Sequence, residues 1–245
     1  MKRHVIIPDT QVKPGVSIKH LEWASRYIVD MAPDVVVHLG DHFDMESLSE
    51  YDKGQKCFEG RRYRKDIEAG NRGIEALTKH LHKLTNLRRV ALLGNHEQRI
   101  ERAIQKDSIL DGTIGYDDFH WKQAGWEVQP FLKICPIDGI WYSHYFHPAN
   151  SPRAYGGRAH SVLANVGHSF AMGHRPGREV ATRTLADGSE QIGLIFGSFY
   201  THNESFKGWQ GNKAHWRGIV VLNEAERGGG DPMPVSLEYL RRKYA

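Results

Sequence analysis

The chain has 245 residues, of which 40% are hydrophobic and 25% are charged, with a formal net charge of +4. These proportions are typical of a globular protein with a sizeable core and argue against intrinsic disorder. No apolar run approaches the ~18 residues of a membrane span, and the N-terminal apolar run is too short for a signal peptide, so we expect a cytoplasmic protein without a membrane partner. Only two cysteines are present, which excludes a disulfide scaffold and a cysteine-ligated zinc site.

The first half of the chain alternates between apolar strands and amphipathic helices. In chain order, we expect a strand at 5–8, a helix at 17–31, a strand at 35–39, a helix at 60–84 and a strand at 90–93. Ser17 suits the N-cap of the first helix. This order is typical of a parallel sheet with right-handed crossovers.

The second half changes to short apolar segments separated by turn signals. Asp-Gly pairs at 138–139 and 187–188 predict hairpins within 134–144 and 180–199. Further strands are expected at 169–172, 218–222 and 235–240. Without a repeat or a linker, we expect an α/β protein with a second, mixed sheet and a single domain over residues 1–245.

Side chains that can bind metal follow five of the predicted strands. They are Asp9 and Gln11, Asp41 and Asp44, Asn95 and His96, His144, and His174. In open α/β sheets, ligands bind beyond the carboxyl ends of the strands, so these residues should meet at one edge. Carboxylate, amide and imidazole donors suit Mn, Fe, Zn or Mg. His147 competes with His144, which we prefer because it lies at the strand end.

In this order, the same residues resemble the motifs of the calcineurin-like metallophosphoesterases. The family pattern D-x-H, G-D-x-x-D, G-N-H-D/E, H and G-H-x-H is matched by Asp9-x-Gln11, 40–44, 94–97, His144 and 173–174. The resemblance implies a four-layer α/β fold, in which two mixed β-sheets pack as a sandwich flanked by helices. It also implies a dinuclear metal centre that hydrolyses phosphate esters with a metal-activated water.

The resemblance assigns metal ligands residue by residue. Asp41 would bridge the two ions. Asp9 and Gln11 would complete the first site (metal one). Asn95, His144 and His174 would complete the second site (metal two).

It also assigns roles beside the metals. His96 resembles the non-ligand histidine that faces the phosphate, and Asp44 resembles the carboxylate that orients this histidine, so both are expected to be catalytic. Three residues are expected to bind substrate, namely Asn95, His42 in the Asp41 loop and Arg175 beside His174.

The chain departs from the family pattern at two positions. Gln11 replaces the histidine of D-x-H, and Pro176 replaces the last histidine of G-H-x-H. Gln11 resembles a variant of phage-type and bacterial members, so the expected location is the cytoplasm of a bacterium or of a phage-infected host. An amide oxygen suits Mn or Mg better than Zn or Fe, so two divalent ions, with Mn favoured, are the predicted cofactors.

Three functions remain open from the sequence. A phosphodiesterase or nuclease acting on DNA, RNA or nucleotides is favoured by the basic run 61–65, whose Tyr63 would stack on a base, and by Met45, where protein phosphatases carry arginine. A phosphomonoesterase similar to Ser/Thr protein phosphatases is favoured by Pro176. A non-catalytic binding module is suggested by Gln11. The aromatic, histidine-rich stretch 202–216 is a further candidate cleft wall.

Overall fold

The computed structural model describes residues 1–204 and 207–245. Its first sheet has six strands in the order β11-β10-β1-β2-β3-β4. Their bounds are β1 His4–Ile7, β2 Val35–His38, β3 Arg88–Leu92, β4 Glu127–Gln129, β10 Gly218–Asn223 and β11 Asp231–Ser236. Strands β1 to β4 pair in parallel, whereas β10 and β11 join antiparallel at one edge.

The second sheet has five strands in the order β5-β6-β7-β9-β8. Their bounds are β5 Cys135–Ile137, β6 Ile140–Ser143, β7 Phe170–Met172, β8 Arg178–Thr184 and β9 Glu190–Phe196. The central strands β6, β7 and β9 are parallel, and the edge strands β5 and β8 are antiparallel to their neighbours. Both sheets are therefore mixed, as expected.

Alternation along the strands divides the apolar side chains between two cores. Val5 and Ile7 pack toward the helices, whereas Ile6 between them packs toward the other sheet, as the period of two requires. Across the intersheet core, Val37 of β2 belongs to one cluster with Tyr142 of β6. The two sheets thus face each other across a buried apolar layer, consistent with a sandwich.

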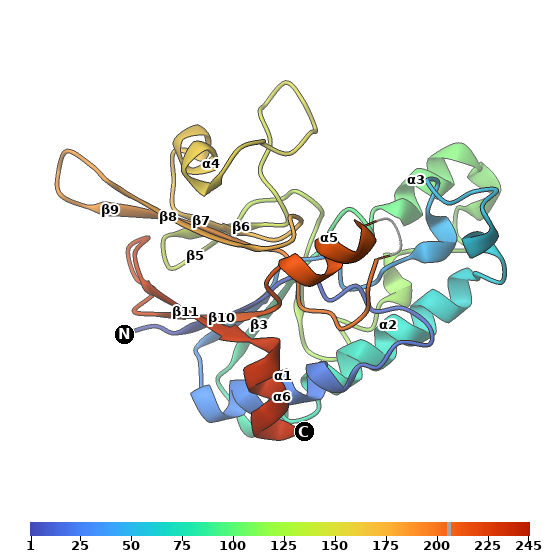
Figure 1. Ribbon diagram of the computed structural model, residues 1–245, viewed down its shortest axis with the longest axis horizontal. Helices are drawn as coiled ribbons and strands as arrows, with labels where there is room; N and C mark the ends of the chain where they lie inside the picture. The colour runs from blue at the N-terminus through green and yellow to red at the C-terminus, as the bar shows by residue number, and fades with distance from the viewer. Residues whose placement is uncertain (205–206) are drawn as a thin grey trace.

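Helices cover the outer faces of both sheets (Figure 1). On the first sheet lie α1 (Lys19–Met31), α2 (Tyr63–Thr78) and α6 (Leu237–Tyr244), whose apolar residues join the core with β1 and β2. On the second sheet lies α4 (Ala159–Val166). The short helices α3 (Arg99–Lys106) and α5 (Gly208–Ala214) lie in connecting segments. The α/β class with two mixed sheets and flanking helices is confirmed.

Several boundaries differ from the sequence prediction. The helix expected at 60–84 spans Tyr63–Thr78 and is followed by a separate 3-10 turn at Leu81–Lys83. The strand expected at 235–240 is wrong in its second half, because the Ser236 hydroxyl accepts a bond from the Tyr239 amide (3.1 Å) and begins α6. The N-cap of α1 is Ile18 rather than Ser17.

Short 3-10 helices occupy several loops, at Glu46–Leu48, Lys56–Phe58, Leu81–Lys83, Ser108–Leu110 and Tyr116–Asp118. Within the described part of the chain, none of the helices combines the length and apolar character needed to cross a membrane.

The loops after β1 and β2 are joined by backbone bonds at the carboxyl edge of the first sheet. The amides of Thr10 and Gln11 donate to the Asp41 carbonyl (3.2 and 2.9 Å), and the Val12 amide donates to the His42 carbonyl (2.6 Å). The two polar loops are therefore held side by side by the fold itself.

Candidate metal centre

Three of the predicted ligands converge from separate loops. Asp41 follows β2, His144 follows β6 and His174 follows β7, and one ligand atom from each lies within 4.8 Å of the others. The Nε2 atom of His144 is 3.3 Å from Oδ2 of Asp41. A carboxylate and two imidazoles this close form a set that could hold a metal ion.

Asn95 adds a fourth donor to this group. Its side-chain oxygen lies 3.0 Å from Nε2 of His144 and 2.8 Å from Nδ1 of His174. Asn95 follows β3. The loops after β2 and β3 of the first sheet therefore meet here with the loops after β6 and β7 of the second sheet. The sequence prediction that these residues come together is supported by their positions.

The second nitrogen of His144 fixes its orientation. Its Nδ1 lies 2.8 Å from the carbonyl oxygen of Leu39, which can only accept, so Nδ1 donates and Nε2 points at Asp41. Burial acts to lower the pKa of His144, but the Asp41 carboxylate outweighs this effect and raises the pKa to about 9. The group therefore attracts positive charge, whether a proton or a metal cation.

Asp9 and Gln11 lie in the loop after β1, whose backbone bonds to the Asp41 carbonyl. Asp9 is buried, and its Oδ1 accepts a bond from the backbone amide of His174 (3.0 Å). Burial raises the pKa of Asp9 above its usual range. The Oε1 atom of Gln11 is buried without a hydrogen-bond partner among residues 1–204 and 207–245. A buried acceptor left in this state costs free energy unless a donor or a cation satisfies it.

Two glycines bring backbone directly against the carboxylates. A Cβ atom at Gly94 would lie 2.1 Å from Oδ1 of Asp41, and one at Gly173 would lie 2.3 Å from Oδ1 of Asp9. No side chain can occupy these positions without moving a carboxylate. Together with the orphaned Gln11 oxygen and the mixed oxygen and imidazole donors, this cradle fits hard or borderline divalent cations.

Glu97 anchors the Asp41 loop, a role that sequence reasoning missed. Its buried carboxylate accepts three backbone bonds, from the amides of Asp41 (3.0 Å), Gly94 (2.7 Å) and Phe43 (2.8 Å). Asp41 has a φ of 49°, a strained value for a residue other than glycine. Glu97 thus holds the loop in this conformation. The available signal was an acidic residue directly after Asn95-His96.

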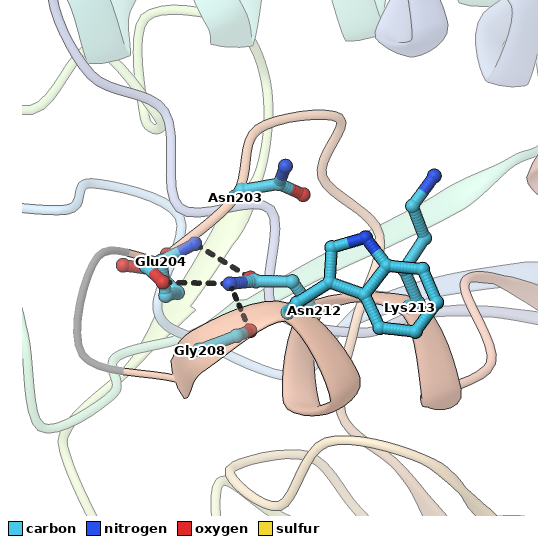
Figure 2. A pocket seen from close by; sticks show the side chains of 6 residues that line it. Asn203, Glu204, Gly208, Asn212 and Lys213 are labelled. Carbon is cyan, nitrogen blue, oxygen red and sulfur yellow. Dashed lines mark hydrogen bonds between the residues drawn. The ribbon is translucent and has the colours of Figure 1, made fainter.

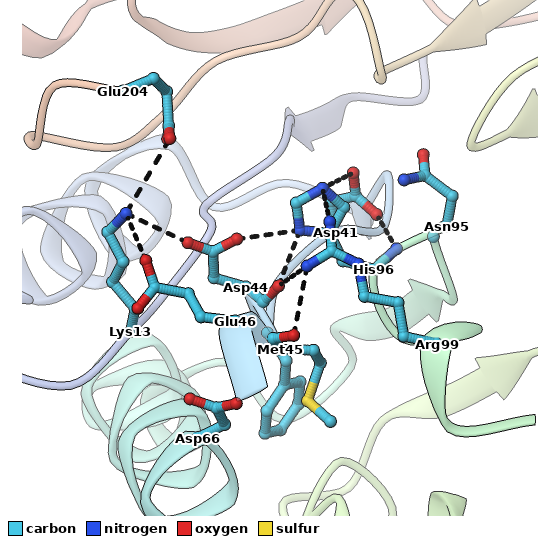
Figure 3. A network of polar contacts seen from close by, with 12 residues as sticks. Lys13, Asp41, Asp44, Met45, Glu46, Asp66, Asn95, His96, Arg99 and Glu204 are labelled. Atoms are coloured by element: carbon cyan, nitrogen blue, oxygen red, sulfur yellow. Dashed lines mark hydrogen bonds and ion pairs between the residues drawn. The ribbon is translucent and has the colours of Figure 1, made fainter. Parts of the chain in front are cut away.

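His96 lies beside the predicted metal ligand Asp41 and pairs with Asp44 (Figure 3). Its Nδ1 is 3.0 Å from Oδ1 of Asp44, and its Nε2 is 3.7 Å from Oδ2 of Asp41. Burial acts to lower the pKa of His96, but Asp41 outweighs it and the net shift is upward. Burial acts to raise the pKa of Asp44, but the hydrogen bond from His96 lowers it to about 2. The pair is therefore built to keep a proton on His96.

Arg99 and Lys13 place two further cations here, neither of which the sequence predicted. The Arg99 guanidinium lies 3.2 Å from Nε2 of His96 and donates to the Asp44 carbonyl (2.7 Å). The Lys13 ammonium lies 3.2 Å from Asp44, 3.0 Å from Glu46 and 3.9 Å from Glu204 (Figure 3). Lys13 therefore connects the His96–Asp44 pair to the segment before α5.

Asp44, His202 and Glu204 form a second group that could hold a metal. The Nε2 atom of His202 is 2.8 Å from Glu204. Because the Lys13 ammonium already lies beside both carboxylates of this group, a cation is supplied by the chain itself.

A cleft of about 890 Å³ opens over these residues. Its lining includes Gln11, Lys13, Asp44, Glu46, Ser49, Tyr51, Asp52, Gln55, Lys56, Cys57, Arg61, Asn95, His96, Arg99, Glu204 and Lys207. The volume is within the range of ~300–1,000 Å³ common for small-molecule sites. His96 and the predicted ligands Gln11 and Asn95 are thus reachable from one cleft.

Of the basic run 61–65, Arg61 is the residue that lines this cleft. Arg61 lines the cleft and pairs with Asp52 (2.6 Å), whereas Arg64 is exposed and pairs with Glu68 along α2. The prediction that Tyr63 stacks on a base is not supported, because its hydroxyl donates to Asp118 (2.5 Å) and its ring is half-buried against the core.

Three other residues considered for the site, His42, Arg175 and His147, make their contacts elsewhere. His42 is buried, with Nδ1 2.7 Å from the Thr10 hydroxyl and Nε2 3.0 Å from the Gly70 carbonyl, so the prediction that it contacts substrate is not supported. Arg175 donates to the Gly157 carbonyl, away from the residues that line the cleft. The ring of His147 lies 2.9 Å from the Ser151 carbonyl, outside the ligand group.

Residues of the stretch 202–216 line part of the cleft and also a separate cavity beside α5. Glu204 lines the cleft and also a cavity of about 320 Å³ beside α5, shown in Figure 2 with Asn203, Asn212 and Lys213. Trp209 lines the cavity beside α5 and is exposed, whereas Trp216 packs on Phe196 with ring centroids 5.6 Å apart.

Comparison with known proteins adds two bacteriophage relatives. No protein-family model matches the chain. It is 29% identical over 208 residues to the Gene 54 protein of Mycobacterium phage L5, which covers 78% of this chain and 75% of the relative. It is 28% identical over 203 residues to the Gene 54 protein of Mycobacterium phage D29, with the same coverage. These names state no activity.

Proposed function

We propose that the protein is a metal-dependent hydrolase of phosphate esters, of the calcineurin-like metallophosphoesterase type, that cleaves phosphodiesters of nucleic acid or nucleotides. The observation that carries this proposal is the position of His96. It lies between a group of four converging donors and an open cleft, and its other nitrogen is held by Asp44. A pure metal-binding scaffold has no need of such a pair.

The proposed centre divides its ligands between two ions. Asp41 would serve both ions, Asp9 and Gln11 would hold metal one, and Asn95, His144 and His174 would hold metal two. When bound, two divalent ions supply positive charge for the phosphoryl oxygens and a water of lowered pKa as the nucleophile. Manganese suits this set because two of its donors are amide oxygens.

The chain's own side chains supply the rest of the chemistry. His96 would keep the proton of Nδ1 against Asp44 and give a proton from Nε2 to the departing alkoxide, once the phosphate replaces Nε2 as the partner of Arg99. Asp44 and its backbone carbonyl hold the imidazole in position. Arg99 places a guanidinium beside His96, where it stabilises negative charge that develops on the phosphate.

The arrangement of layers supports the same proposal at the level of fold. Helices cover two mixed sheets that face each other, and the ligands lie in loops at their shared edge. We assign this architecture to the four-layer metallophosphoesterase fold in a single domain, residues 1–245. The phage relatives support the cytoplasm of a phage-infected host as the location.

Two model esters test the proposal. The purified protein, loaded with manganese, is assayed on bis-p-nitrophenyl phosphate and p-nitrophenyl phosphate. We expect hydrolysis that requires the metal and favours the diester. A strong preference for the monoester identifies a phosphomonoesterase instead. No hydrolysis of either ester by the manganese-loaded protein identifies a non-catalytic binding module.

A further inference from the structure

A second cavity, of about 420 Å³, adjoins the metal cleft. Tyr51 and Arg99 line both cavities, so the two spaces share a wall. Arg99 is also the residue whose guanidinium contacts His96. A ligand that extends from the metal centre past Arg99 therefore enters the second cavity.

The second cavity is rich in cations. It is lined by Lys53, Arg99, Arg102 and Lys106, against the two acidic residues Glu50 and Asp107. Arg99, Arg102 and Lys106 follow the spacing i, i+3, i+7 along α3 and therefore lie on one face of the helix.

Few carboxylates balance these cations. Lys53 and Lys106 both pair with the single carboxylate of Glu50, and the Arg102 guanidinium donates to the neutral side-chain oxygen of Gln98 (3.0 Å). By contrast, the cavity beside α5 also adjoins the cleft but contains one acidic and one basic residue, Glu204 and Lys213 (Figure 2). A polyanion is attracted toward α3 rather than toward α5.

An exposed aromatic ring stands at the boundary between the two spaces. Tyr51 is 86% exposed, and proteins that bind single strands use accessible aromatic rings of this kind as platforms on which unpaired bases stack. Tyr51 thus offers the accessible ring that the half-buried Tyr63 does not.

We propose that the cavity lined by α3 is a nucleotide subsite for a single-stranded polynucleotide. The scissile phosphate lies at the metal centre, the neighbouring phosphate is bound by Lys53 and Arg102, and an adjacent base stacks on Tyr51. This inference rests on the proposed function, since it places the reacting phosphate in the metal cleft.

Binding and cleavage of a labelled single-stranded oligonucleotide of about ten nucleotides test the subsite. The double variant Lys53→Ala/Arg102→Ala removes two exposed cations. We expect its dissociation constant, followed by fluorescence anisotropy, to rise about tenfold. The number of ions released on binding, given by the slope of affinity against salt concentration, should fall by about two. Hydrolysis of bis-p-nitrophenyl phosphate, which has no second phosphate for Lys53 and Arg102 to bind, should stay within about twofold of wild type.

Matched variants separate the subsite from a general effect of charge. Arg241→Ala/Arg242→Ala removes two exposed cations from α6 and should bind the oligonucleotide as wild type does. Tyr51→Ala should weaken single-strand binding, and Tyr51→Phe should restore it. Equal losses in the α3 and α6 double variants overturn the proposal.

Failure of the subsite and failure of the proposed function give different results. If the diester is hydrolysed but the α3 double variant binds the oligonucleotide normally, the subsite is wrong and the hydrolase stands. If the oligonucleotide binds through these residues but neither substrate is cleaved, the subsite stands and the hydrolase is wrong.

Discussion

The two sides of the candidate metal centre are constructed differently. On the side of His144 and His174, the Asn95 oxygen lies within hydrogen-bond distance of both imidazoles, and the Leu39 carbonyl orients His144. On the side of Asp9 and Gln11, one carboxylate oxygen is already used by a backbone amide, and the amide oxygen has no partner in the described chain. The donors on the first side are held in position by the protein itself, whereas the Gln11 oxygen on the second side needs a bound cation or donor as its partner.

The two sides should therefore bind their ions with different affinities. Imidazole is a stronger donor to transition metals than a neutral amide oxygen. Burial also raises the pKa of Asp9, so a cation bound there has to offset the cost of keeping this carboxylate charged. We therefore expect metal one to bind more weakly than metal two.

Asp41→Asn should have the largest effect, because Asp41 belongs to both sides. The substitution removes the negative charge that both proposed ions would share, and it removes the carboxylate partner of His144. We expect metal affinity to fall more than ~100-fold, with activity lost in parallel. Elemental analysis of the purified variant measures this. Asp187→Asn, at the exposed turn between β8 and β9, is the control, and a fully loaded Asp41→Asn protein would contradict the assignment.

His96→Ala should separate catalysis from metal binding. Removing a general acid lowers turnover by ~10²–10⁴-fold, while both metal sites should stay nearly full because His96 is not a ligand. Turnover on the diester and metal content are measured on the same sample. His147→Ala, outside the ligand group, should change neither. If His96→Ala empties the site, His96 is a ligand.

Glu97→Gln should destabilise the Asp41 loop. Its amide NH₂ cannot accept, so at least one of the three buried backbone donors loses its partner. We expect a loss of about 1–3 kcal/mol in the free energy of unfolding, measured by denaturant titration. The control is Glu68→Gln on the exposed side of α2. A stability equal to wild type would show that Glu97 does not hold this loop.

Gln11→His should have the smallest and most selective effect. An imidazole in place of the amide should tighten the weaker manganese stage by about tenfold and leave the tighter stage unchanged. Calorimetric titration of both proteins tests this. If the substitution changes neither stage, Gln11 is not a ligand and other residues hold metal one.

Local signals explain what the sequence predicted. Buried strands such as 5–8 and 35–39 appear as continuous apolar runs, and the polar residues directly after them, Asp9 and Asp41, mark their carboxyl ends. The class of fold and the convergence of the ligands follow from this pattern.

Contacts between distant segments explain what the sequence missed. Lys13 and Glu204 meet across most of the chain, and Glu97 reaches the Asp41 amide from a different loop. His42 follows Asp41 directly, but its side chain turns toward the core. The strand predicted through residue 240 failed because its apolar pattern also suits α6, and only the Ser236 cap distinguishes the two.

Titration of manganese into the metal-free protein, with bound metal and diester hydrolysis followed together, tests the asymmetric two-ion centre most directly. We predict two stages of binding, with hydrolysis rising only as the weaker stage fills, because the nucleophile and the phosphate need both ions. A single stage, hydrolysis complete before the second ion binds, or no manganese binding would contradict it.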